Sequence, residues 1–171
     1  NIFDHATSVF AEIIERMWKQ GQHAAILNIG SSIPKSSFYQ ETQICLFYSW
    51  VLTDIGKVSE AEQLLHKAEE NALKELNSSD IESEEYSNAK KQIGRIATAF
   101  ARHYIHISQE YKIEPYCITA VKNLAKEDDF WLSWALFAEG SVALMKNDIF
   151  TAIQSFVKAS AYAQKYNSLY L

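Results

Sequence analysis

The chain has 171 residues, 48% of them hydrophobic, and this is enough for a sizeable core. Its formal net charge is −5 and the sequence carries no basic stripe, so the chain is a poor candidate for direct binding to nucleic acid. It contains only five glycines and two prolines, and this scarcity of helix breakers favours long helices over a turn-rich β fold.

Apolar residues recur along most of the chain with the helical period of about 3.6 residues. We predict eight helices, over residues 6–20, 23–31, 38–55, 59–76, 80–111, 115–126, 130–146 and 148–166. No segment shows the alternating pattern that predicts a half-buried strand. Because the connections are short, successive helices should form antiparallel pairs in an all-α fold.

Polar residues and one proline predict where three of these helices begin. Ser79 and Glu82 have the spacing of a capping box, in which each side chain bonds an unpaired backbone N–H of the other residue. Pro115 suits the first turn of a helix, where a missing N–H costs nothing. Asn147 is expected to be the N-cap of the last helix.

Two segments, GKVSEAEQLLHKA and NDIFTAIQSFVKA, have small residues at the same two places and a large apolar residue between them. These residues are Ala61, Leu65 and Ala68 in the first copy and Ala152, Phe156 and Ala159 in the second. We expect the small residues to let the second helix of a pair approach the first, and the large residue to fill the groove between pairs. A lone pair cannot bury its apolar face, so the pairs must stack.

This spacing resembles the tetratricopeptide repeat, whose helix pairs span about 34 residues. The residues at the signature positions of that repeat are Cys45, Ser49, Leu52, Gly56, Ala61, Leu65 and Ala68 in the earlier copy and Leu136, Gly140, Ala143, Ala152, Phe156 and Ala159 in the last. A third, poorer copy places Cys117, Val121 and Leu124 on its second helix. The resemblance implies a right-handed tetratricopeptide-like superhelix of about eight helices, forming one domain over residues 1–171.

One segment makes the resemblance more specific, because its pattern is typical of one group of proteins. Its pattern is L-x-x-x-W-x-L-x-x-x-G-K-x-x-E-A-E-x-L-L-x-x-A-E, carried by Leu46, Trp50, Leu52, Gly56, Ala61, Glu62, Leu64, Leu65, Ala68 and Glu69. This looks like the helical-repeat region of large LuxR-type regulators related to the maltose regulator MalT, which lies between an ATP-binding module and a DNA-binding helix-turn-helix. The chain has neither a G-x-x-x-x-G-K-[ST] loop nor a terminal basic helix. We therefore expect a piece of a larger protein, the sensor and partner-binding part, with DNA reached only through another domain.

The sequence offers no clear constellation for catalysis or metal binding. His103 and His106 share a helix face, but a metal site would need further ligands such as Glu110. The acidic residues between Asp80 and Glu85 lie in a polar run and favour a solvated helix start. No nucleophile elbow, glycine-rich cradle or cysteine–histidine pairing is present. We expect no catalytic residue, no metal site and no cofactor.

Cys45 and Cys117 lie within apolar patterns and are expected to be reduced core residues of an intracellular protein. No signal peptide opens the chain. The longest apolar run, residues 130–145, is interrupted by Glu139 and is too short to span a bilayer. The expected location is the cytoplasm, without a membrane partner.

The first helices of stacked pairs line a concave surface on which repeat proteins bind partners. The inward positions implied by the resemblance are Gln43, Leu46, Trp50 and Asp54 in the first copy, Arg102, His106, Gln109 and Glu110 in the third, and Trp134, Phe137, Ser141 and Met145 in the last. Arg102 would suit a carboxylate or phosphate; the alternatives are that it pairs with an acid of the chain or reaches water. The aromatic residues fit a core equally well.

The favoured interpretation is a non-catalytic sensor and interaction domain that binds a small-molecule effector, a peptide or a partner protein in this groove. Binding would shift the parent protein between resting and active states, provided that the ligand prefers one state. Two alternatives stay open, namely a generic tetratricopeptide scaffold without a regulator and a helical domain that completes an enzyme elsewhere in the parent chain. Trimming such a stack exposes apolar surface, so self-association is a further expectation.

Overall fold

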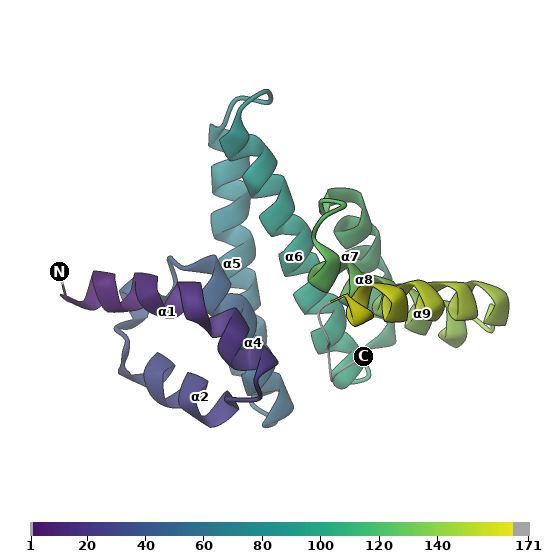
Figure 1. Cartoon of the computed structure of the whole chain (residues 1–171), viewed down its shortest axis with the longest axis horizontal. Coiled ribbons are helices and arrows are strands. Elements are labelled where there is room, and N and C mark those ends of the chain that lie inside the picture. Colours follow the sequence, from purple (N-terminus) through teal and green to yellow (C-terminus); the bar gives the residue numbers. More distant parts are fainter. Residues whose placement is uncertain (1, 166–171) are drawn as a thin grey trace. The chain divides into compact units, whose positions relative to one another are not determined.

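The computed structural model describes residues 2–165, and the side chains of residues 4–165. These residues form nine α-helices and no strand, which confirms the predicted all-α class for this part of the chain. The helices are α1 Ile2–Lys19, α2 His23–Ser32, α3 Lys35–Phe38, α4 Thr42–Asp54, α5 Val58–Ser78, α6 Glu84–His106, α7 Glu110–Asn123, α8 Asp129–Met145 and α9 Ile149–Gln164 (Figure 1).

The chain divides into two compact units, Asn1–Lys74 and Glu75–Leu171. The first unit holds α1 to α4 and most of α5, and the second holds α6 to α9. The single domain over residues 1–171, with one superhelix running through it, stays a prediction.

In the first unit, α4 is the central helix. It contacts both α1 and α2, and all of its residues from Ile44 to Thr53 are buried except the half-buried Tyr48. Its apolar residues therefore cover every side, as is typical of a helix in a core. Trp18 of α1 packs at 5.0 Å from Trp50 and 5.9 Å from Phe47 of α4, measured between ring centroids.

In the second unit, α8 packs against both α6 and α7, and α9 packs against α8. Ala97, Ala120 and Ala135 meet where α6, α7 and α8 come together, and Tyr116 and Leu124 cover them. Small side chains permit this close approach of three helices. Each unit thus contains a helix hairpin followed by a helix that contacts both of its members.

The small residues of the repeated spacing lie in the core, since none of the four alanines is more than 3% exposed. Phe156 of α9 lies against Gly140 of α8, where an added Cβ would be only 2.7 Å from the Phe156 ring. Phe156 also lies 5.6 Å from Phe137 of α8. The large residue of the last copy therefore packs within its own helix pair, and its place in a groove between pairs stays a prediction.

The predicted helix over residues 80–111 is interrupted. α6 ends at His106, and α7 begins at Glu110. Between them, Ser108 has a φ of 56°, a left-handed conformation that ends a helix. Pro115 consequently lies inside α7 and not in its first turn. The additional short helix α3 lies just before α4, which begins later than predicted, at Thr42.

Two helix caps also differ from the prediction. Ser83, and not Ser79, caps α6 by accepting a hydrogen bond of 3.1 Å from the backbone N–H of Tyr86. Asp148 caps α9 by accepting one of 3.1 Å from Thr151. Its neighbour Asn147 has a φ of 59° and belongs to the turn that ends α8. The hydrogen bond from Thr151 lowers the pKa of the Asp148 carboxyl.

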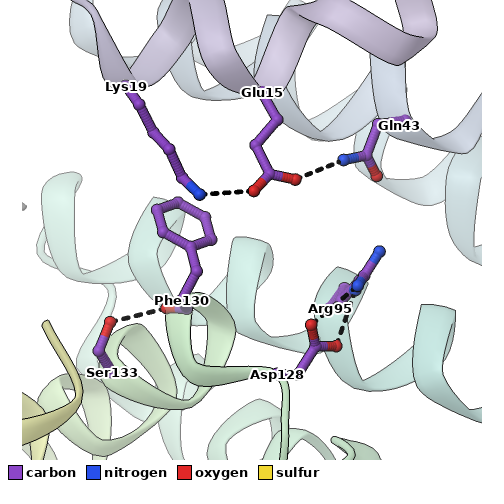
Figure 2. Close-up of polar contacts among 7 residues, drawn as sticks. All are labelled: Glu15, Lys19, Gln43, Arg95, Asp128, Phe130 and Ser133. Carbon is purple, nitrogen blue, oxygen red and sulfur yellow. Dashed lines mark hydrogen bonds and ion pairs between the residues drawn. The ribbon is translucent and has the colours of Figure 1, made fainter. Parts of the chain in front are cut away.

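One ion pair of the second unit is largely buried. Arg95 of α6 donates hydrogen bonds of 2.9 Å and 2.8 Å from Nε and Nη2 to the carboxylate of Asp128, just before α8 (Figure 2). The two side chains are 17% and 11% exposed. Such two-pronged pairing is strong and directional, so it fixes the α7–α8 connection against α6.

Asp128 and its neighbour Asp129 form a matched pair for mutation. Asp128→Asn leaves the Arg95 guanidinium without its charged partner, and we expect the free energy of unfolding to fall by about 3 kcal/mol. Asp129→Asn removes a contact of 2.9 Å with Lys165, whose side chain is 55% exposed, and should cost less than about 1 kcal/mol. Urea unfolding followed by circular dichroism measures both values, and equal losses would contradict the assignment.

Substitutions at two glycines test how closely the helices approach each other. At Gly94 of α6 an added Cβ would lie 2.8 Å from the backbone nitrogen of Leu124, whereas at Gly140 it would meet the movable ring of Phe156. Alanine favours the helix by about 1 kcal/mol over glycine. We expect Gly94→Ala to lower the unfolding free energy by about 1–3 kcal/mol despite that gain. Gly140→Ala should stay within about 1 kcal/mol of the parent chain, measured by the same unfolding curves.

Candidate functional site

Three of the predicted site residues come together on α6 and α8 in the second unit. The Arg102 guanidinium carbon lies 5.2 Å from the centroid of the Trp134 ring, within the range of a cation–π interaction. The Trp134 indole is almost buried, and the Phe137 ring meets it edge-on at 6.0 Å. We call Arg102, Trp134 and Phe137 the arginine–tryptophan site.

The remaining predicted residues of the third copy lie around the end of α6. His106, one turn after Arg102, is exposed at the last residue of α6. Gln109 directly precedes α7 and is half-buried, and Glu110 is the first residue of α7. Since the helix breaks at Ser108, the predicted helical register holds as far as His106 and is wrong for the two residues after the break.

The predicted site residues of α8 that follow Trp134 have different environments along the helix. Phe137 contacts Phe156 of α9, so part of its ring belongs to the hairpin core. Ser141 donates a hydrogen bond of 2.9 Å to the carbonyl oxygen of Phe137. Met145, at the last turn of α8, is exposed.

The predicted residues of the first unit have three different environments. Gln43 donates a hydrogen bond of 3.0 Å to Glu15, which also pairs with Lys19 at 2.6 Å (Figure 2). Trp50 is fully buried against Trp18, as the core alternative predicts. Asp54 is exposed at the end of α4. A groove that combines these residues with the arginine–tryptophan site stays a prediction, since they belong to different units.

The sequence reasoning missed Arg95, which lies two helical turns before Arg102 on α6. Its guanidinium carbon lies 5.9 Å from the centroid of the Trp131 ring on α8. The spacing of seven residues between the two arginines, and of three between the two tryptophans, puts each pair on one helix face. That spacing is the signal by which the pattern is recognisable in the sequence.

The two histidines considered as metal ligands have different environments. His103 is fully buried beside the Tyr104 ring, at 5.3 Å, whereas His106 is exposed. Among the residues that the structure describes, no group of three histidine, cysteine, aspartate or glutamate side chains is placed to hold a metal ion. Within residues 2–165, no helix combines the length and apolar character that a membrane span requires.

Both cysteines are buried free thiols, as predicted. Burial, together with the nearby carboxylates of Glu41 for Cys45 and Glu139 for Cys117, raises the pKa of each thiol from 9.0 to about 12. Because the thiolate and not the thiol is the nucleophile, neither side chain is activated for chemistry at neutral pH.

We expect both thiols to resist a disulfide reagent such as Ellman's at pH 8 in the folded chain and to react after unfolding in guanidinium. Unfolded thiols ionise near their ordinary pKa and folded ones only near 12, so the unfolded state releases protons first as the pH rises. The free energy of unfolding should therefore fall as the pH rises above about 9. Rapid labelling of either cysteine in the folded chain would contradict this.

No family model, curated protein or solved structure matches the chain. The functional assignment depends on the residues and contacts of the chain itself.

Proposed function

We propose that the chain is a non-catalytic, tetratricopeptide-like repeat module that binds an effector or a partner protein at the arginine–tryptophan site. The observation that carries the proposal is the Arg102 guanidinium held 5.2 Å above the Trp134 ring. An arginine stacked on an aromatic ring keeps its planar fork of N–H donors, which matches a carboxylate or a phosphate.

The chain contains an example of this chemistry. Arg95 lies over Trp131 and holds the Asp128 carboxylate with two hydrogen bonds. Arg102 lies over Trp134 on the same two helices. We propose that a carboxylate or phosphate of the ligand takes at Arg102 the role that Asp128 has at Arg95.

The repeat interpretation is supported within each unit. α4 contacts both helices of the α1–α2 hairpin, and α8 contacts both helices of the α6–α7 hairpin. A helix seated on a preceding hairpin is the contact that stacks repeats into a solenoid. A right-handed superhelix, with a concave surface on its first helices, extends this relation and remains part of the proposal.

We further propose that the parent protein is a cytoplasmic LuxR-type regulator related to MalT, in which this module is the sensor. The support is the segment around Trp50, whose matched residues Leu46, Ala61 and Leu65 are fully buried. Gly56 of the same segment has a φ of 81° in the turn before α5. The alternative is a scaffold module without a regulator.

Extending the open reading frame on both sides of the segment that encodes this chain distinguishes a regulator from a scaffold. A regulator requires a G-x-x-x-x-G-K-[ST] loop encoded upstream and a basic helix-turn-helix encoded downstream. If the extended frame encodes neither, the regulator is excluded and the scaffold remains.

A ligand for the arginine–tryptophan site should be a small carboxylate, a phosphate or an acidic peptide. Screening such compounds by thermal shift should find one that raises the unfolding midpoint, because a ligand of the folded state stabilises it by mass action. Arg102→Ala should weaken the binding about tenfold or more, and Arg102→Lys should restore only part of it, since lysine lacks the planar fork.

Arg16→Ala, at an exposed position of α1 in the first unit, is the matched control and should leave the midpoint shift unchanged. A shift that survives Arg102→Ala as fully as it survives Arg16→Ala would overturn the assignment of this site.

A further inference from the structure

The first unit contains a pocket of about 390 Å³ that none of the predicted site residues lines. Its volume lies in the range of small-molecule sites, about 300–1,000 Å³. Phe38, Leu52 and Leu64, from α3, α4 and α5, form a buried apolar floor. Charged and polar side chains on exposed positions surround this floor, so the pocket suits a ligand with an apolar body and charged ends.

One wall of the pocket is the Tyr48 ring, which packs directly against a glycine. An added Cβ at Gly30 of α2 would lie 2.2 Å from that ring, so only a glycine permits this approach. The Phe38 ring meets Tyr48 edge-on at 5.0 Å. Burial and the carboxylate of Glu60 raise the pKa of Tyr48, so its hydroxyl is a hydrogen-bond donor at neutral pH.

The two ends of the pocket carry opposite charges. Glu60 and Lys67 both line it from α5, and seven residues of helix place their backbones about 10 Å apart on one face. Asn71 donates a hydrogen bond of 2.6 Å to the carbonyl oxygen of Tyr39, which places α3 beside the Lys67 end of α5. Lys35, on α3, also lines the pocket and is a second cation there.

These charged groups are available to a ligand at little cost. Lys67 pairs with Glu70 at 2.7 Å and Glu60 with Lys57 at 3.3 Å, both at exposed positions where ion pairs contribute little. Glu70 keeps a second partner, Lys74, when Lys67 turns into the pocket.

We propose that this pocket binds a short peptide of two or three residues with apolar side chains, its carboxylate at Lys35 and Lys67 and its amino group at Glu60. An extended peptide of this length spans about 7–10 Å, which is close to the separation of the Glu60 and Lys67 backbones along α5. Apolar side chains of the peptide lie on the floor formed by Phe38, Leu52 and Leu64. The Tyr48 hydroxyl and the Gln63 amide, both at the pocket, are hydrogen-bonding groups for the peptide backbone.

The test uses the whole chain and a set of di- and tripeptides of leucine and phenylalanine, each with free ends, with an acetylated amino group or with an amidated carboxylate. Calorimetry measures the affinity, and amide chemical shifts locate the binding. Free peptides should bind at millimolar concentrations or below and shift the amides of residues 30–39 and 60–67. Each cap should weaken binding about tenfold, because each removes a hydrogen-bonded charge.

Variants assign each end of the peptide. Glu60→Gln should weaken the binding of the free peptide, and acetylation of the amino group should then weaken it little further. Lys67→Met should also weaken the binding, and amidation of the carboxylate should then have little further effect. Glu12→Gln, at an exposed position of α1 outside the pocket, is the matched control and should change nothing. Arg102→Ala should leave the peptide affinity unchanged, so this result is independent of the arginine–tryptophan site.

The proposal is overturned if none of the free peptides binds, or if the shifted amides lie outside the pocket. It is also overturned if acetylation leaves the affinity unchanged, since the site would then be an anion site that does not use Glu60.

Discussion

Close approach between helices is the constraint on which the rest of this structure depends. At three glycines, a methyl group would collide with a neighbouring element, namely a phenol ring at Gly30, a backbone at Gly94 and a phenyl ring at Gly140. Alanines complete the contacts where α6, α7 and α8 meet. Because interiors are close-packed, such contacts limit the positions that the neighbouring longer side chains can take.

The arginines of α6 show how this packing produces a binding surface. Once α6 and α8 lie in contact, residues two turns apart on α6 face tryptophans nearly one turn apart on α8, and two guanidinium groups lie over two indoles. For Arg95 the chain supplies a carboxylate from the connection before α8, and the result is a structural ion pair. At Arg102 we propose that a ligand supplies the carboxylate or phosphate, and we therefore assign the two arginines different roles.

The features that could be predicted from the sequence are those that follow from the helical periodicity of apolar and small residues. The hairpin of α8 and α9 and the buried positions Ala61 and Ala68 follow from apolar and small residues at helical spacing, and the structure has them there. The sequence did not predict the break at Ser108, because a serine with positive φ has no glycine or proline to mark it. It placed a cap at Asn147 and not at Asp148, because both residue types are good caps and only the turn geometry separates them.

The pocket of the first unit was beyond sequence reasoning for a different reason. Its lining comes from four helices and two connections, and its charged ends are ordinary surface residues in the sequence. Trp50, in contrast, was a candidate for both a site and a core, and the rings of Trp18 and Phe47 around it decide for the core. A side chain's role in a binding site depends on neighbours from other helices, and periodicity within one helix does not specify them.

The geometry of the proposed peptide pocket depends on the conformation of α5. Glu60 and Lys67 lie on one helix, so the separation of the two charged ends is constant only while that helix is intact. Helix rises about 1.5 Å per residue and extended chain about 3.3 Å, so unwinding between these residues would separate the ends beyond the reach of a short peptide. A bound peptide therefore favours the helical state of α5, and α5 continues past Lys74, where the first unit ends, to Ser78. A ligand that prefers one state of a shared helix in this way satisfies the physical condition for a signal between units.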